Sequence, residues 1–227
     1  MKTINLSNED LDAIDLSEFD KYLNEKYKYT YKRGGYGFYD KSGVEQYKLL
    51  AYMSTLLDNE TILDVGTFEG GSALALSKNK TNNVVSIDIN YQVNQDIDLD
   101  NILFLEGDIL NHDEEIIKIE SNFRGRTLDK NYGKELIDKS KLILYDTVHN
   151  GIVEKQFHDY LVESNWSGIC IWDDIKFRSN RNLRTGMIDF WDSIENEKED
   201  VTKYAHWTGT GMVWYNQDKD INLKWKH

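Results

Sequence analysis

Acidic side chains follow four apolar segments of this 227-residue sequence, where buried strands would end. Asp64, Asp88 and Asp146 each close such a segment, and Asp108 lies just beyond the one that ends at Glu106. In an open sheet of parallel strands, ligands bind beyond the carboxyl ends of the strands. Carboxylates that crowd together there raise one another's pKa unless a ligand or a cation uses them. The spacing therefore predicts a ligand site around these acids.

A glycine-rich turn follows the first of these acids, because residues 64–72 read DVGTFEGGS. Glycines let the backbone approach a ligand closely, and the helix that follows would direct its N-terminus at the ligand. Nicotinamide-binding folds carry G-x-G-x-x-G at this point. Here the spacing is wider and an acid leads, which suits the ammonium of an amino acid and favours S-adenosylmethionine over NAD. We expect the turn to bind this cofactor through Asp64, Gly66, Thr67, Gly70, Gly71 and Ser72.

Two later acids complete the expected cofactor site. Asp88 lies 22 positions after Gly66, where a carboxylate can accept hydrogen bonds from both hydroxyls of a ribose. Asp108 is placed to accept a hydrogen bond from the exocyclic amine of adenine, and Ile109 beside it is included in the site.

A second group of acids predicts a metal. Asp146 ends one apolar run, and the pair Asp173 and Asp174 ends the next. If the two strands are neighbours, three carboxylates converge at one end of the sheet and cannot all stay ionised without a cation. Hard oxygen ligands in that number suit Mg²⁺ or a similar ion. We expect a divalent metal, Mg²⁺ in the first place, at Asp146, Asp173 and Asp174.

Taken in order, these motifs resemble the class I S-adenosylmethionine-dependent methyltransferases. The glycine-rich first motif matches residues 64–72, the acidic end of the second strand matches Asp88, and a Gly-Asp-apolar third motif matches 107–109. The acids near strands four and five are similar to those of the small metal-dependent O-methyltransferases of the catechol and macrocin types. The resemblance implies methyl transfer from S-adenosylmethionine to a hydroxyl of a small molecule, with a divalent metal orienting that hydroxyl.

The resemblance also implies a general base. His149 follows Asp146 by three residues, where such families often place their base, and we expect these two residues to be catalytic. The ordinary pKa of imidazole suits the role. The alternatives are that His149 is a metal ligand or precedes the next helix as a cap, with Lys155 as the base, and His206 is expected to be structural. N-methyl transfer, other metal-dependent chemistry and non-catalytic cofactor binding stay open as functions.

Strands and helices that position these residues alternate along the chain. Apolar runs predict strands over residues 61–65, 84–89, 102–106, 141–145 and 168–172. Helices are expected over residues 8–27, 44–57, 71–78, 113–121 and 152–163, and a loop or surface insertion over 122–139. Residues 201–207 and 212–216 flank Thr208-Gly209-Thr210-Gly211 and predict an antiparallel hairpin.

This alternation predicts an α/β fold with a mostly parallel sheet covered by helices on both faces. With the resemblance, it implies a Rossmann-like, doubly wound sheet of seven strands that ends in the antiparallel hairpin. We expect one methyltransferase-like domain over residues 1–227, with an N-terminal arm that can act as a lid over 1–43 and a core over 44–216.

Composition limits the partners and the location. Acids outnumber bases 40 to 27, which gives a formal charge of −13 and argues against nucleic acid as a partner. The single cysteine, Cys170, cannot form an intrachain disulfide, and no apolar run resembles a signal peptide or a membrane span. We therefore expect a cytoplasmic protein that binds a small molecule and no membrane, and a homo-oligomer is compatible with the sequence.

Overall fold

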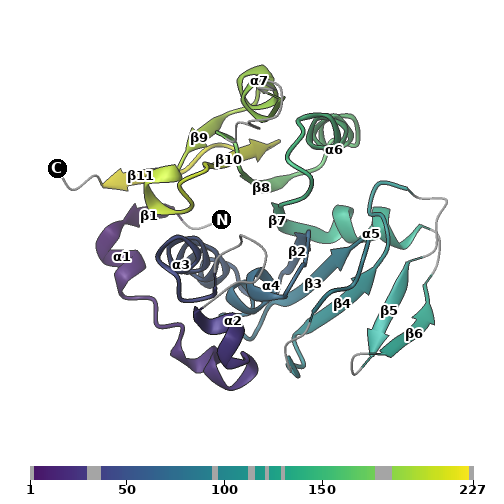
Figure 1. Cartoon of the computed structure of the whole chain (residues 1–227). Coiled ribbons are helices and arrows are strands. Elements are labelled where there is room, and N and C mark those ends of the chain that lie inside the picture. The colour runs from purple at the N-terminus through teal and green to yellow at the C-terminus, as the bar shows by residue number, and fades with distance from the viewer. Residues whose placement is uncertain are drawn as a thin grey trace.

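The computed structural model describes residues 3–29, 37–93, 97–111, 116–120, 123–128, 131–176 and 186–224. Within these ranges a sheet of nine strands has the order β6-β5-β4-β3-β2-β7-β8-β10-β9 (Figure 1). Its centre is parallel and consists of β4 (Ile102–Glu106), β3 (Asn83–Asp88), β2 (Thr61–Val65), β7 (Ser140–Tyr145) and β8 (Gly168–Asp173). The chain builds outward from β2 to β4 and then returns to add β7 on the other side of β2. Ligand crevices open at this reversal in doubly wound sheets.

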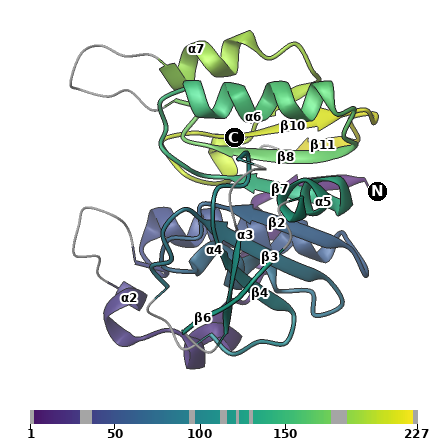
Figure 2. The same cartoon turned by 90° about the vertical axis from the view of Figure 1, so that its right-hand side faces the viewer.

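Helices cover both faces of the sheet (Figure 2). One face carries α3 (Lys41–Thr55) and α4 (Gly71–Leu76), and the other carries α5 (Tyr132–Lys139), α6 (Ile152–Glu163) and α7 (Gly186–Ser193). Successive strand residues point to opposite faces, so Ile62 belongs to the first core and Leu63 to the second. Because both faces are buried, the central strands are mainly apolar, and the sequence locates all five to within one residue at either end. The predicted fold class is confirmed.

Two antiparallel hairpins extend this sheet. Strand β10 (Thr210–Tyr215) pairs antiparallel with β8 and with β9 (Lys198–Asp200). The expected strand over 201–207 is wrong, because residues Thr202–Tyr204 form the 3-10 helix η2. Asp200 Oδ1 accepts a hydrogen bond from the backbone N–H of Thr202 at 3.0 Å, which turns the chain out of the strand. The connection is therefore a longer loop than the tight turn expected at residues 208–211.

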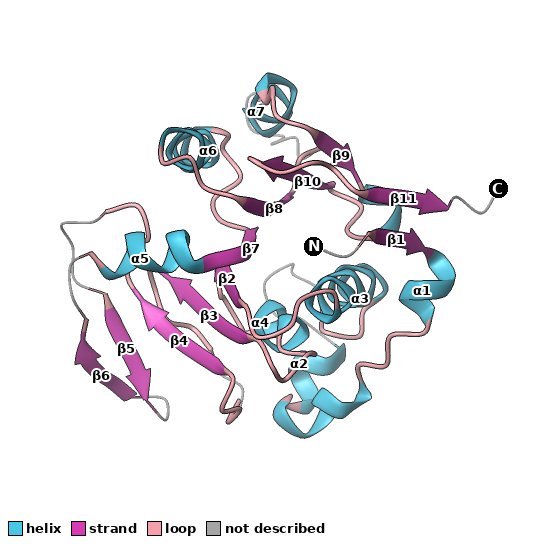
Figure 3. Cartoon of the chain, turned by 180° about the vertical axis from the view of Figure 1, so that it is seen from behind, coloured by secondary structure: helices cyan, strands magenta, loops and turns pink. Residues whose placement is uncertain are grey.

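The second hairpin lies at the opposite edge and raises the strand number above the expected seven (Figure 3). It consists of β5 (Ile117–Glu120) and β6 (Phe123–Thr127), and β5 pairs antiparallel with β4. The helix expected over residues 113–121 is wrong for its described part, 116–120, and residues 113–115 lie outside the described residues. Apolar residues alternate with charged ones over 117–120, which is the period of a strand.

The expected loop over residues 122–139 is wrong as well, because it contains β6 and helix α5. Leu136 and Ile137 of α5 are buried against the second core. On the outer side Lys134 pairs with Asp138 at 2.6 Å, one helical turn away. Such pairs stabilise an exposed helical face.

The N-terminal segment is broken into short helices, where one helix was expected over 8–27. These are α1 (Asn8–Asp12), η1 (Ser17–Tyr22) and α2 (Glu25–Tyr29). Asp15 accepts a hydrogen bond from the backbone N–H of Ser17 at 2.8 Å, a local bond that competes with a continuous helix. Strand β1 (Ile4–Ser7) pairs in parallel with β11 (Ile221–Lys224), far along the chain (Figure 3). Of the helices in the described ranges, none has the length and apolar character that crossing a bilayer requires.

Candidate active site

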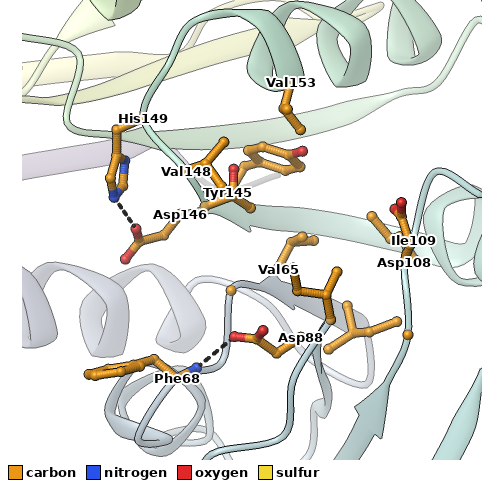
Figure 4. Close-up of a pocket in the computed structure, with 15 residues that line it drawn as sticks. Val65, Phe68, Asp88, Asp108, Ile109, Tyr145, Asp146, Val148, His149 and Val153 are labelled. Carbon is orange, nitrogen blue, oxygen red and sulfur yellow. Dashed lines mark hydrogen bonds and ion pairs between the residues drawn. The ribbon is translucent and has the colours of Figure 1, made fainter.

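A cavity of about 510 Å³ opens at the carboxyl ends of β2, β3, β4 and β7, at the reversal of strand order (Figure 4). Acidic side chains stand around an apolar floor in this cavity. The lining includes Val65, Gly66, Phe68, Asp88, Ile89, Asp108, Ile109, Asp146, Val148 and His149. The structure thus brings the ends of the expected motifs to one place.

The glycine turn passes between strands with no room for side chains. Gly66 has φ of +100°, and a methyl group there would overlap the carbonyl oxygen of Asp146. Its N–H donates to the carbonyl of Ile87 at 2.9 Å, so the backbone is fixed between β3 and β7. Gly70 has φ of +88°, and a methyl group on Gly71 would overlap the hydroxyls of Tyr27 and Tyr47. The turn needs these glycines to pack.

Asp88 and Asp108 both line this cavity and are held by local backbone bonds. Asp88 accepts hydrogen bonds from the N–H groups of Phe68 at 3.1 Å and Asn90 at 3.0 Å, the first of which is drawn in Figure 4. Asp108 accepts one from the N–H of Leu110 at 2.9 Å, and Ile109 lies beside it. The roles of these acids toward ribose and adenine stay predictions, since the geometry fixes only their positions.

Asp64 lies behind the turn, fully buried, and lines neither this cavity nor the second one described below. Its Oδ2 accepts hydrogen bonds from Ser72 Oγ at 2.9 Å and Ser86 Oγ at 2.6 Å. Its Oδ1 has no hydrogen-bond partner among the described residues. Any contact of Asp64 with a cofactor ammonium would therefore have to run through Ser72, which does line the second cavity. Burial raises the pKa of Asp64 to about 6.

Replacing Asp64 by Asn is expected to stabilise the ligand-free protein above pH 6. The folded-state pKa exceeds the ordinary value of 3.8, so between these values the native state binds more protons and stability falls as pH rises. A difference of about two pKa units corresponds to about 3 kcal/mol at pH 7. Urea denaturation at pH 4 and pH 7 measures this. The variant should match the wild type at pH 4 and exceed it at pH 7, and equal stabilities at pH 7 would contradict the argument.

A second cavity of about 360 Å³ adjoins the first. It lies between the glycine turn, the N-terminal helices and the ends of β7 and β8. Its lining includes Tyr27, Gln46, Tyr47, Thr67, Ser72, Asp146, His149, Asp173, Asp174 and His206. The two cavities share Gly66, Phe68, Asp146 and His149, so a ligand in one lies next to a ligand in the other.

Three side chains in the second cavity could together hold a metal ion. Donor atoms of Asp173, Asp174 and His206 lie within 4.8 Å of one another. His206 was expected to be structural, but its loop between β9 and β10 turns back onto β8, so that His206 Nδ1 lies 3.6 Å from Asp174 Oδ1. Asp146 is not part of this three-residue group, although it lines the same cavity. The sequence offers only one signal for His206, its place beside the Thr208-Gly209 turn.

Several bonds fix the two carboxylates. Asp173 Oδ1 accepts hydrogen bonds from Gln46 Nε2 at 3.2 Å and Thr210 Oγ1 at 3.4 Å, and Asp174 accepts one from Thr208. Burial, followed by the charges of Asp146 and Asp174, raises the pKa of Asp173 well above its usual value. Burial alone would raise the pKa of Asp174, but hydrogen bonds and the nearby histidine charges lower it overall.

Asp146 also lies close to other negatively charged side chains. About 37% of its side chain is exposed, and burial of the carboxylate within the site raises its pKa well above the usual range. The charges of Asp174 and Asp64 add to this rise. A positive charge in the cavity would relieve the repulsion among these acids.

The His149 ring lies between two of these acids. Its Nε2 is 3.4 Å from Asp146 Oδ1, as Figure 4 shows, and its Nδ1 is 3.5 Å from Asp174 Oδ2. The residue has φ of +54°, a left-handed conformation that is uncommon outside glycine. Lys155, the alternative base, is exposed, pairs with Asp159 at 2.7 Å and lines neither cavity. The geometry favours His149 for proton transfer.

Two tyrosines line the second cavity, Tyr27 of α2 (Glu25–Tyr29) and Tyr47 of α3 (Lys41–Thr55). The hydroxyls of Tyr27 and Tyr47 are 3.1 Å apart, and the Tyr47 ring stacks on Phe38 with centroids 4.5 Å apart. These aromatic side chains therefore pack α2 and Phe38 against α3, and the two tyrosines also line the cavity. Tyr27, Tyr47 and Gln46 could not be selected from the sequence, because none of them belongs to one of the motifs described above.

Solved methyltransferase structures share this fold. A proposed caffeoyl-CoA O-methyltransferase from Staphylococcus aureus gives a TM-score of 0.50 at 14% identity, over 75% of this chain and 82% of that chain. SAH-bound PaMTH1 of Podospora anserina gives 0.49 at 12% identity, over 96% and 100%. The Bacillus cereus O-methyltransferase in complex with SAH gives 0.49 at 14% identity, over 75% and 80%. No family model and no curated protein matches the chain. The resemblance found in the sequence is confirmed at the level of the fold.

Proposed function

We propose that this chain is an S-adenosylmethionine-dependent O-methyltransferase that acts on a hydroxyl of a small molecule with the help of a divalent cation. One observation carries the proposal. The larger cavity, with Asp88 and Asp108 at the strand ends, meets the acid and imidazole groups of the second cavity at Asp146 and His149. A cofactor in the first cavity and an acceptor in the second would face each other across these two residues.

The residues of the first cavity fit the cofactor. Gly66 lines this cavity and packs against the backbone of Asp146, and the buried Asp64 provides negative charge behind Ser72 in the adjoining second cavity. Asp88 would hold the ribose hydroxyls, and Asp108 with Ile109 would hold the adenine. S-adenosylmethionine supplies an electrophilic methyl group on sulfur.

The donor set of the second cavity fits a divalent cation. Carboxylates suit Mg²⁺ and Mn²⁺, and imidazole suits transition-metal ions, so two carboxylates with one imidazole extend the choice beyond the Mg²⁺ expected from the sequence. Asp173, Asp174 and His206 would hold the ion, with Asp146 nearby. A bound cation lowers the pKa of a hydroxyl that it coordinates.

His149 would move the proton. With Nδ1 protonated and facing Asp174 Oδ2 at 3.5 Å, the ring would present Nε2 beside Asp146 at the wall common to both cavities. Nε2 can then accept the proton of the acceptor hydroxyl as that oxygen bonds to the methyl carbon and the carbon–sulfur bond breaks. Asp174 fixes the tautomer and the orientation of the ring, and the shared wall keeps the two reactants close.

Calorimetry with S-adenosylmethionine tests the cofactor claim. We expect the wild type to bind this cofactor and not NAD, and we expect Asp88→Ala to weaken binding about tenfold or more, since it removes a charged acceptor of two hydrogen bonds. Asp218→Ala, at an exposed acid outside the site, is the matched control. Absence of binding by the wild type would refute the proposed function. Detection of a methyl gain by mass spectrometry on hydroxylated acceptors then identifies the substrate.

A further inference from the structure

Glu154, in the first turn of α6, carries a buried carboxylate that the roles above do not use. Only 1% of the residue is exposed. Its Oε1 accepts hydrogen bonds from the backbone N–H of His149 at 2.9 Å and from Thr147 Oγ1 at 3.2 Å, and its Oε2 accepts one from the N–H of Gly151 at 2.8 Å. All three donors belong to the segment that leaves β7 and enters α6. A buried carboxylate that accepts three hydrogen bonds holds the donor segment firmly in place.

One of these bonds caps the helix, since Gly151 is the N-cap residue of α6, and the other two hold the segment that precedes it. Asn150 Oδ1 already accepts the N–H groups of Ile152 at 2.7 Å and Val153 at 3.1 Å, which are the first free donors of α6. Glu154 instead binds N–H groups at two left-handed positions, His149 with φ of +54° and Gly151 with φ of +76°. This conformation is uncommon for a residue other than glycine, and the bonds to Glu154 help to hold it.

The conformation of this segment determines the shape of both cavities, because its residues form part of their walls. Asp146 and His149 line both, and Thr147 and Val148 line the larger one, where Figure 4 shows the His149 ring directed at Asp146. If His149 relaxed to an ordinary φ, its ring would leave Asp146 and Asp174, and the wall of the larger cavity would move with it.

We propose that Glu154 is the positioning residue of the site, which holds the segment Asp146–Gly151 in the conformation that cofactor binding and the His149 ring require. The inference rests on the proposed function for the identity of the ligand. The hydrogen bonds themselves exist in the protein without any ligand, so the two can fail separately.

The test compares Glu154→Gln and Glu154→Leu with Glu163→Gln, an exposed glutamate on the same helix. Glutamine keeps one acceptor oxygen and leucine keeps none, so the effects should be graded. We expect the affinity for S-adenosylmethionine, measured by calorimetry, to fall about tenfold in Glu154→Gln and further in Glu154→Leu. In NMR spectra of the folded, ligand-free variants, the amide signals of His149 and Gly151 should move upfield and lose protection from exchange. Glu163→Gln should change neither.

Three outcomes decide the proposal. Folded Glu154 variants that bind S-adenosylmethionine as the wild type does would overturn it, whatever their thermal stability. Unchanged amide signals of His149 and Gly151 in Glu154→Gln would overturn it too. If the wild type itself fails to bind the cofactor, the proposed function fails, while the amide signals still decide whether Glu154 holds the segment. Glu154→Gln suffices if the leucine variant does not fold.

Discussion

Replacing Asp174 by Asn is expected to weaken Mn²⁺ binding roughly a hundredfold while leaving the affinity for S-adenosylmethionine largely intact. Asp174 supplies one of the three donors and a full negative charge to the candidate metal group, and the amide keeps its shape without the charge. It lines the second cavity and not the first, so the cofactor should be little affected. Electron paramagnetic resonance titration with Mn²⁺ and calorimetry with the cofactor measure the two affinities.

The matched control for this prediction is Asp192→Asn, at an exposed aspartate of α7. It should bind Mn²⁺ as the wild type does. A wild-type Mn²⁺ affinity in Asp174→Asn would show that the acids of the second cavity serve another purpose.

A further pair of variants distinguishes the two possible sets of metal ligands. His206→Gln should weaken Mn²⁺ more than Asp146→Asn if the third ligand is His206, and the reverse order would favour the set expected from the sequence.

Replacing Gly66 by Ala is expected to cost about 4 kcal/mol or more of the free energy of unfolding. The added methyl group would overlap the carbonyl oxygen of Asp146, and φ of +100° is unfavourable for alanine. Relief requires β2 and β7 to separate, and these strands are paired along their length. Chemical denaturation of the variant and the wild type measures the loss.

Gly125→Ala provides the control, since Gly125 is exposed in the edge strand β6. It should leave the free energy of unfolding within about 1 kcal/mol of the wild type. A Gly66→Ala variant with a midpoint close to that of the wild type would mean that the turn has more freedom than its packing indicates. The same variant, if it folds, should also bind the cofactor weakly, because its strand ends would be displaced.

The central strands could be predicted because a short apolar run between turn residues is typical of a strand that is buried on both faces. Ile62 and Leu63 face opposite cores, and both are fully buried, so neighbouring residues of the strand are both apolar. At the edges this signal is lost. Ile117 and Ile119 alternate with charged residues over only four positions, which is too short to separate a strand from one side of a helix. What decided between them was the pairing of Ile119 with Phe104, a contact between distant positions.

The site was predictable where it depends on strand ends and hidden where it depends on loops. Asp88, Asp108 and Asp146 follow directly from the positions of the strands, and all three line the first cavity. His206 comes from a loop whose course depends on η2 and on the bond between Thr208 and Asp174. The role of Glu154 could not be predicted for another reason. An acid in the first turn of a helix is common, and the sequence does not show that this one is buried.

The parallel pair of β1 and β11 has a consequence for how the protein is made. Ile4 pairs with Ile221, so β1 cannot pair during synthesis until a distant part of the chain has been made. The strands around the larger cavity are complete once Tyr145 has emerged, whereas the second cavity also needs His206. Domains fold during synthesis as their segments emerge. The order of translation therefore separates the two cavities, and a nascent chain from which Tyr145 has emerged but His206 has not would contain the strands of the first cavity without the complete second cavity.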